Sequence, residues 1–174
     1  MRLKTPKNFL TRPTADRVKE SLFSILNGLI NFSEVNAVLD IFAGTGALGL
    51  ESISRGASSA TFIDNSTAEI IRDNIARAKF ENCNVLRGDF EKILRRLAKE
   101  NLTFDLIFSD PPYAKGLAQK SLELVAELNL LSGLMIVEHG AEENLDAPTD
   151  FQLVRKITYG HTTAIEIFLR EKAT

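Results

Sequence analysis

Hydrophobic residues recur along the chain in two alternating patterns, which predict helices and strands in turn. Between residues 14 and 28 the apolar side chains have helical spacing, with Thr14 as a candidate N-cap and Asp16 in the first turn. Short apolar runs predict buried strands at 37–42, 60–64, 84–87, 104–109 and 134–138. The segments between them predict helices at 48–55, 67–79, 90–99 and 117–128.

Regular alternation of strands and helices predicts a parallel sheet with helices on both faces. The end of the chain differs, because 151–158 and 163–170 are two strand-like runs joined by Tyr159-Gly160-His161-Thr162, which predicts an antiparallel hairpin. The expected fold class is therefore α/β and Rossmann-like, a seven-stranded, mostly parallel sheet ending in that hairpin. No repeat or linker interrupts the pattern, so we expect a single domain over 1–174, with a basic N-terminal segment at 1–13.

The composition is that of a globular domain, with 44% hydrophobic and 25% charged residues among 174. No apolar run approaches the roughly 20 residues that cross a bilayer, and the first residues lack the apolar stretch of a signal peptide. We therefore expect a cytoplasmic protein that does not contact a membrane. One cysteine, Cys83, and two histidines, His139 and His161, cannot form a disulfide or a Cys/His zinc site, so we expect no metal.

The net charge of −2 does not indicate a nucleic-acid-binding protein, but the first twenty residues are locally basic. Six cations face only Asp16 and Glu20 there, and they are Arg2, Lys4, Lys7, Arg12, Arg17 and Lys19. Such a run is either an ordinary solvated end or a patch that contacts phosphates, and the pattern alone leaves both open. The candidate substrate-binding residues are Lys7, Arg12, Thr14 and Arg17.

Acidic residues follow four consecutive predicted strands. In an open α/β sheet, ligands bind at the carboxyl ends of the strands, where the strand order reverses. Asp40, Asp64, Asp89 and Asp110 lie at or just past those ends. We therefore expect their carboxylates to converge on one rim.

The segment Gly44-Thr45-Gly46-Ala47-Leu48-Gly49 matches the pattern G-x-G-x-x-G after the first predicted strand. Glycines let the backbone approach a nucleotide-like ligand, and the next helix offers free N–H groups. The alternative is a tight strand-to-helix turn that binds nothing. Asp64 ends the next strand, where an acid can bind the hydroxyls of a ribose, as a dinucleotide or a nucleoside-type cofactor requires.

The segment Ser109-Asp110-Pro111-Pro112-Tyr113 follows the fourth predicted strand. Two successive prolines make a rigid turn whose carbonyls can accept hydrogen bonds from a ligand. The exocyclic amine of a nucleic-acid base is a poor nucleophile, because its lone pair is delocalised into the ring. Asp110 and the carbonyl of Pro111 could each accept one of its N–H groups and favour a pyramidal, reactive nitrogen.

Tyr113 completes this candidate site, because its ring could stack on a base that has left its helix. The alternative is a plain Pro-Pro turn with an exposed tyrosine. The position directly after the fourth strand favours the catalytic interpretation. The expected catalytic residues are therefore Asp110, Pro111, Pro112 and Tyr113.

With its glycine loop, the Asp-Pro-Pro-Tyr turn resembles the class I amino-methyltransferases, whose cofactor is S-adenosyl-L-methionine. Three further segments, 12–23, 39–51 and Tyr159-Gly160, resemble the bacterial small-subunit ribosomal RNA guanine-N2 methyltransferases of the RsmD type. The resemblance covers nearly the whole chain. It implies transfer of a methyl group to the N2 amine of a guanine in ribosomal RNA, within a small-subunit ribonucleoprotein particle.

The resemblance also implies where the cofactor binds. Asp64 would hold the ribose, and Asp89 the adenine amino group with Phe90 beside the ring. The full set of implied cofactor-binding residues is Asp40, Phe42, Ala43, Gly44, Thr45, Gly46, Asp64, Asn65, Asp89 and Phe90. The N-terminal segment is shorter than is usual in the family, which affects the expected docking of RNA. We expect a monomer.

Three other functions remain open. A nicotinamide oxidoreductase would explain the glycine loop and Asp64. It would also need a second region that binds the substrate, and it would leave the Asp110–Tyr113 turn without a function. An enzyme that methylates the N6 amine of adenine would share the same turn. A non-catalytic ribosome-assembly factor would keep the fold alone. Glu138 and His139 end the fifth predicted strand, and we expect them to be structural or peripheral.

Overall fold

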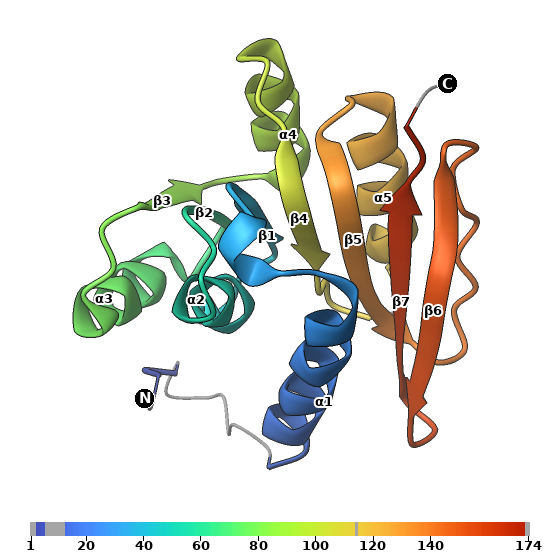
Figure 1. Cartoon of the computed structure of the whole chain (residues 1–174), viewed down its shortest axis with the longest axis horizontal. Helices are drawn as coiled ribbons and strands as arrows, with labels where there is room; N and C mark the ends of the chain where they lie inside the picture. The colour runs from blue at the N-terminus through green and yellow to red at the C-terminus, as the bar shows by residue number, and fades with distance from the viewer. Residues whose placement is uncertain (1–2, 6–12, 114, 173–174) are drawn as a thin grey trace.

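Seven strands and five α-helices alternate along the chain in the computed structural model, which describes residues 3–5, 13–113 and 115–172 (Figure 1). The strands are β1 (Val38–Ile41), β2 (Ala60–Asp64), β3 (Cys83–Arg87), β4 (Phe104–Ser109), β5 (Leu131–Gly140), β6 (Phe151–Tyr159) and β7 (Thr163–Arg170). The helices are α1 (Pro13–Leu29), the 3-10 turn η1 (Phe32–Glu34), α2 (Ala47–Ser54), α3 (Ala68–Ala78), α4 (Phe90–Lys99) and α5 (Leu117–Glu127).

All seven strands form one sheet in the order β3-β2-β1-β4-β5-β7-β6. The pairs among β1 to β5 are parallel, whereas β7 is antiparallel to both β5 and β6. The chain therefore adds β2 and β3 on one side of β1, and then adds β4 and the later strands on the other side. This arrangement confirms the expected α/β class with its antiparallel hairpin, and it places the reversal of strand order between β1 and β4.

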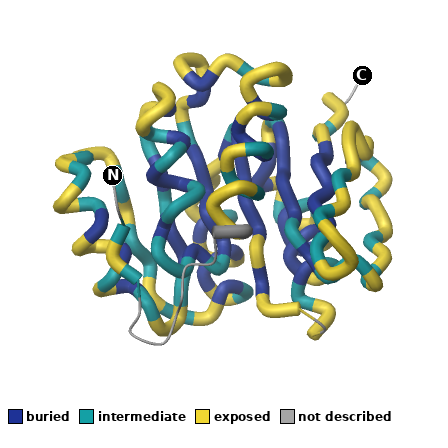
Figure 2. The backbone as a smooth tube through the Cα atoms, turned by 90° about the horizontal axis from the view of Figure 1, so that it is seen from below, coloured by how far each residue is buried: buried dark blue, intermediate teal, exposed yellow. Residues whose placement is uncertain are grey.

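Helices cover both faces of the sheet and give each face its own hydrophobic core. On one face, α4 and α5 pack through residues such as Leu94 and Leu122. On the other, α1, α2 and α3 pack through residues such as Phe23, Leu50 and Ile71. The central strands are consequently buried along their length while the outer sides of the helices are exposed (Figure 2).

Glycine sets the distance between α2 and the sheet. A Cβ atom on Gly49 would lie 2.4 Å from Cε1 of Phe62, which is buried in β2. Only a residue without a side chain lets α2 lie this close to β2. Close packing of helix and strand is also the role of the third glycine in a G-x-G-x-x-G loop.

Two elements differ from the expected ones by more than one residue at an end. The helix α1 begins at Pro13, so Thr14 lies inside it rather than capping it; proline fits the first turn because its missing N–H needs no partner there. The strand β5 starts at Leu131 and ends at Gly140, longer than the expected 134–138. Its pairing with β7 from Leu134 to Gly140 explains the extension at the carboxyl end.

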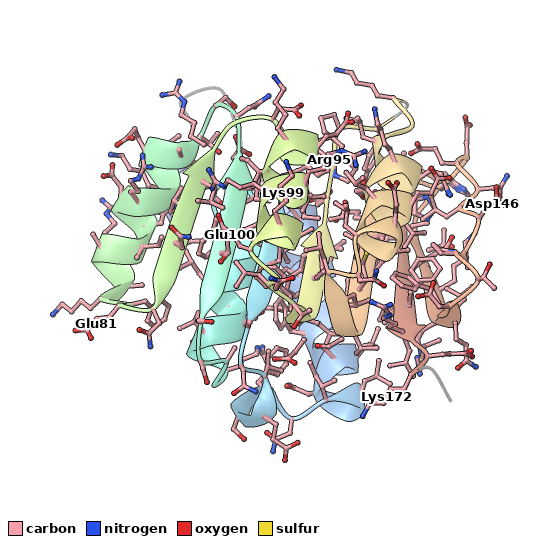
Figure 3. All side chains as sticks on the ribbon, turned by 90° about the horizontal axis from the view of Figure 1, so that it is seen from above. Glu81, Arg95, Lys99, Glu100, Asp146 and Lys172 are labelled. Carbon is pink, nitrogen blue, oxygen red and sulfur yellow. The ribbon has the colours of Figure 1, made fainter. Side chains whose placement is uncertain are left out.

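Many charged side chains lie on the surface of the fold, although Asp40 and Glu166 are buried. Figure 3 shows the labelled residues Glu81, Arg95, Lys99, Glu100, Asp146 and Lys172 projecting outward from the elements that carry them. All six are exposed. None of the helices that the structure describes is both long enough and apolar enough to cross a bilayer.

Candidate active site

The register of the central strands brings the sequence-predicted site residues to one rim. Ile41 of β1 pairs with Ser109 of β4, and Ser109 pairs in turn with Val137 of β5. The next residues along these strands therefore lie side by side, with Asp110 between the loop that follows β1 and Glu138. The predicted cofactor loop and the predicted catalytic turn are thus neighbours at the point where the strand order reverses.

The loop after β1 turns sharply through left-handed backbone. Phe42 has a φ of 58°, and Gly44 has a φ of 60°. For a phenylalanine this conformation costs about 1 kcal/mol or more, and such strain is typical of functional loops. A Cβ atom on Gly44 would have no heavy atom within 4 Å, so the space in front of the loop is open. The loop carries Ala43, whose N–H donates to the carbonyl of Ile63 at 2.9 Å.

Asp64 holds this loop in place. Its Oδ2 accepts the N–H of Gly44 at 3.0 Å, while Oδ1 accepts the N–H groups of Ser66 and Thr67, both at 2.9 Å. Burial alone would raise the pKa of Asp64, but these hydrogen bonds outweigh burial and lower the pKa below its ordinary value of 3.8. The carboxylate is therefore ionised at neutral pH. Because Oδ2 accepts only one of these bonds, it can accept another from a ribose hydroxyl.

Asp40 lies in β1 and is more deeply buried than Asp64, with 1% of its surface exposed. Its Oδ2 accepts the N–H of Gly49 at 3.0 Å, which ties the first turn of α2 to the strand. Burial raises the pKa of Asp40 to about 8; the hydrogen bond from Gly49 opposes this rise and the charge of Asp64 adds to it. Asp40 therefore binds its proton more tightly than an ordinary aspartate does.

The residues expected around an adenine ring lie at the next strand ends. The rings of Phe42 and Phe90 contact each other with centroids 4.7 Å apart. Asp89 is exposed and caps α4, since its Oδ1 accepts the N–H of Lys92 at 3.1 Å. Asn65 is exposed directly after β2.

The Asp110–Tyr113 turn is buried at one residue and open at the others. Pro111 is buried, while Asp110, Pro112 and Tyr113 are exposed. Although part of Asp110 is exposed, the protein around its carboxyl group displaces water from it, and this desolvation raises the pKa of the carboxyl well above 3.8. The charges of Glu138 and Asp40 raise it further.

Glu138, which the sequence analysis expected to be structural or peripheral, lies beside the candidate catalytic turn. Tyr113 donates its hydroxyl hydrogen to Oε1 of Glu138 at 2.7 Å, and the hydroxyl lies 3.0 Å from Oγ1 of Thr163 in β7. Burial raises the pKa of Glu138, although the hydrogen bond from Tyr113 and the neighbouring His139 partly oppose the rise. The signal in the sequence was the position of Glu138 at the end of the strand beside β4.

Asn74 of α3 is a second residue that sequence reasoning missed. Its side chain is fully buried, accepts the N–H of Lys4 at 2.7 Å, and donates to the carbonyls of Lys4 and Thr45, each at 3.0 Å. It therefore links the N-terminal segment to the glycine loop. A polar residue on the buried side of a predicted helix was the available signal.

The structure describes only some of the basic N-terminal residues. Lys4 pairs with Asp73 at 2.7 Å, and Lys19 lies 4.0 Å from Glu51, so both cations face acids of the protein itself. Arg17 is exposed on α1. Lys7 and Arg12 lie outside the described residues, and so does the side chain of Thr14. Within 3–5, 13–113 and 115–172, no cluster of three or more His, Cys, Asp or Glu residues could hold a metal ion.

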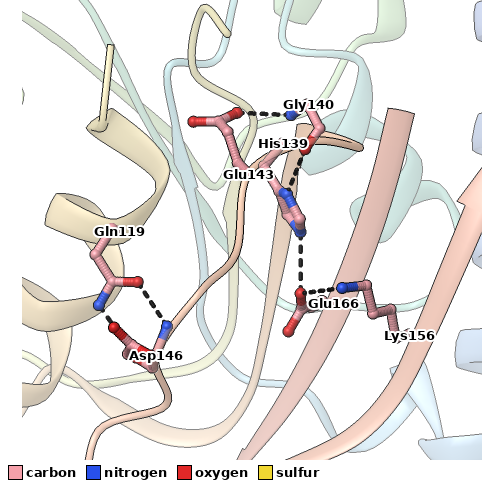
Figure 4. Close-up of polar contacts among 7 residues, drawn as sticks. All are labelled: Gln119, His139, Gly140, Glu143, Asp146, Lys156 and Glu166. Atoms are coloured by element: carbon pink, nitrogen blue, oxygen red, sulfur yellow. Dashed lines mark hydrogen bonds and ion pairs between the residues drawn. The ribbon is translucent and has the colours of Figure 1, made fainter. Parts of the chain in front are cut away.

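His139 belongs to a separate buried network at the end of β5 (Figure 4). Its Nδ1 lies 2.9 Å from the carbonyl of Gly140, and its Nε2 lies 3.1 Å from Oε1 of Glu166. Lys156 reaches the same oxygen at 3.3 Å. This network anchors β5 to β7 and β6, which agrees with the structural role expected for His139.

The chain is similar in sequence and structure to several known proteins. It is 33% identical to ribosomal RNA small subunit methyltransferase D of Escherichia coli, over 98% of this chain and 85% of the relative. The Haemophilus influenzae protein of that name is 36% identical, over 86% and 78% of the two chains. The solved structure of the putative methyltransferase yhhF from Escherichia coli superposes with a TM-score of 0.82 at 32% sequence identity. The match covers 97% of this chain and 91% of the yhhF chain.

One family model accounts for nearly all of the sequence. The model described as "Conserved hypothetical protein 95" matches residues 1–168. These residues include both the glycine loop and the Asp110–Tyr113 turn. The chain therefore belongs to the Conserved hypothetical protein 95 family, alongside its relatives named ribosomal RNA small subunit methyltransferase D.

Proposed function

We propose that this protein transfers a methyl group from S-adenosyl-L-methionine to the N2 amine of a guanine in small-subunit ribosomal RNA. It acts in the cytoplasm, as a single-domain monomer, on an assembled or partly assembled small-subunit particle. The relatives named ribosomal RNA small subunit methyltransferase D support the class of substrate. The RsmD-type segments at 12–23 and 39–51 support guanine N2 as the target.

One observation carries this proposal. The Asp110–Tyr113 turn and the glycine loop follow residues that pair directly across β4 and β1, Ser109 and Ile41. A donor bound at the loop and a base bound at the turn would therefore meet without a large movement of the chain. Proximity and orientation of this kind supply much of the rate in a two-substrate transfer.

The residues at the loop fit the proposed cofactor. The open space in front of Gly44 leaves room for a ligand against the backbone. Asp64 is ionised and fixed at the end of β2, where it can accept hydrogen bonds from ribose hydroxyls. The paired rings of Phe42 and Phe90 offer an apolar surface for an adenine, with the exposed Asp89 beside them. Asn65 contributes from the same strand end.

S-adenosyl-L-methionine, when bound, supplies a methyl group on a positively charged sulfur, which keeps the electron pair of the broken bond. Asp110 accepts one N–H of the guanine N2 amine, and the carbonyl of Pro111 accepts the other. The nitrogen lone pair is then free to form the new bond to the methyl carbon. Pro112 keeps the turn rigid, and Tyr113 stacks on the base.

The transfer leaves one proton too many on N2, and Asp110 is placed to take it. Its raised pKa suits a group that must accept a proton near neutral pH. The proton then passes from Asp110 to water, because the residue is exposed. The exposed Arg17 of α1, with Lys7, Arg12 and Thr14, contacts the RNA outside the reacting base.

Methyl transfer to isolated particles tests the proposal. The purified protein is mixed with radiolabelled S-adenosyl-L-methionine and small-subunit particles from cells that lack it, and the labelled nucleosides are identified by mass spectrometry. We expect N2-methylguanosine in the small-subunit RNA. Label only in N6-methyladenosine would refute the guanine assignment, and no label in any nucleoside would favour a non-catalytic assembly factor.

A further inference from the structure

The Asp-Pro-Pro-Tyr turn does not by itself select guanine, because a turn that holds an exocyclic amine suits adenine or cytosine equally well. Selection needs a group that contacts the part of the base next to the amine. Glu138 is in that position, since it follows Val137, which pairs with Ser109, the residue before Asp110. The two carboxyl groups therefore lie side by side at the ends of neighbouring strands, which are about 4.8 Å apart.

The Glu138 carboxylate is only partly used by the protein. Oε1 accepts the Tyr113 hydroxyl at 2.7 Å. In the part of the chain that the structure describes, Oε2 has no hydrogen-bond partner and no lysine or arginine pairs with the carboxylate. Among the described residues, Oε2 is not one of the buried side-chain atoms without a partner, so it is open to solvent and able to accept a hydrogen bond from a ligand.

We propose that Glu138 determines the specificity for guanine, by accepting the ring N1–H with Oε2 while Asp110 accepts the adjacent amine. This inference rests on the proposed methyltransferase function. Guanine presents N1–H and the N2 amine as neighbouring donors, which match two neighbouring carboxylates. Adenine and cytosine present a ring nitrogen lone pair beside their amines, which would face the negative charge of Glu138 and be repelled.

The hydrogen bond from Tyr113 supports the same role. It fixes the Glu138 side chain, so that Oε2 is held in one direction before the base arrives. Thr163, at the start of β7, holds the tyrosine hydroxyl from the other side. A preorganised acceptor loses little conformational entropy on binding, and a buried polar group left unpaired by the wrong base discriminates strongly against it.

The test compares Glu138→Gln with Glu142→Gln in methyl transfer to small-subunit particles. Both variants remove one negative charge by the same substitution, but Glu142 is exposed in the loop after β5. We expect Glu138→Gln to lower kcat/KM at least tenfold while its melting temperature and its affinity for S-adenosylhomocysteine stay near those of the unaltered protein. Glu142→Gln should stay within twofold. A kcat/KM within twofold for Glu138→Gln would overturn the inference while leaving the proposed function intact.

Two further variants separate base recognition from the positioning of Tyr113. Tyr113→Phe removes the hydroxyl but leaves Glu138 in place, so its loss should be about tenfold smaller than that of Glu138→Gln. If Tyr113→Phe and Glu138→Gln lowered kcat/KM by the same factor, Glu138 would act only by positioning Tyr113, and the inference would be overturned. If Glu138→Gln fails to fold, Glu138→Asp keeps the charge but withdraws the carboxylate, and full activity in that variant would overturn the inference as well. Failure of the unaltered protein to form N2-methylguanosine would refute both proposals.

Discussion

Replacing Asp110 by alanine separates the catalytic role of this carboxylate from its effect on folding. The substitution removes one of the two proposed acceptors of the N2 amine and the proposed proton acceptor. Loss of one preorganised contact of this kind raises a reaction barrier by about 2.7–4 kcal/mol, which lowers turnover roughly 100- to 1000-fold. The glycine loop and Asp64 are untouched, so the affinity for S-adenosylhomocysteine should change by no more than a few-fold.

Although Asp110→Ala should lower activity, it should not lower the stability of the protein at pH 8. Crowding by the protein and the charges of Glu138 and Asp40 raise the pKa of Asp110, so the folded protein binds its proton more tightly than the unfolded chain does. Stability from such a group is present below its ordinary pKa of 3.8 and is lost as the pH rises toward the folded value. Asp110→Ala removes this loss, so its melting temperature at pH 8 should equal or exceed that of the unaltered protein.

Two assays check these expectations together. Single-turnover transfer to small-subunit particles measures the chemical step, and thermal unfolding between pH 5 and pH 8 measures stability. Turnover within threefold of the unaltered protein would remove Asp110 from the mechanism. A large fall in melting temperature at pH 8, combined with lost cofactor binding, would mean that Asp110 acts by holding the fold together.

Three other substitutions test the surrounding structure. Asn74→Ala deletes the bonds to Lys4 and Thr45, so it should lower the free energy of unfolding by about 1–3 kcal/mol in urea denaturation and weaken S-adenosylhomocysteine binding in titration calorimetry; unchanged affinity would detach Asn74 from the glycine loop. In Asp40→Asn the side chain cannot ionise. The free energy of unfolding of the unaltered protein should fall between pH 4 and pH 8, by up to about 1.4 kcal/mol per pH unit for one proton, and this fall should be smaller in the variant. An equal fall in the two proteins would contradict the raised pKa of Asp40. Arg17→Glu should weaken particle binding and reduce its salt dependence without affecting cofactor affinity, and an identical salt slope would exclude a phosphate contact at Arg17.

The order of elements could be predicted because each strand end carries strong local signals. Apolar runs followed by glycine, aspartate or proline marked the ends of β1, β2 and β4. The rule that ligands bind at strand ends then placed the candidate residues on one rim before the strand order was known. The structure adds the register, and with it the adjacency of Asp110 to both the glycine loop and Glu138.

Features that depend on contacts distant in sequence could not be predicted. The position of Glu138 beside the candidate turn depends on the pairing of β5 with β4, and its bond to Tyr113 joins residues 25 apart. Asn74 contacts the N-terminal segment across 70 residues, a contact with no local pattern. The raised pKa of Asp40 likewise follows from its complete burial, with a smaller contribution from the charge of Asp64, and neither can be judged from periodicity alone.

The central claim is that the cofactor lies directly beside the Asp110–Tyr113 turn with space for a flat base between them. A crystal structure of the protein with S-adenosylhomocysteine tests this most directly. The account predicts that the ribose hydroxyls lie on Asp64 and that the sulfur faces the carboxylate of Asp110 across a gap wide enough for one purine ring. A ligand bound elsewhere, or a sulfur turned away from a closed turn, would contradict it.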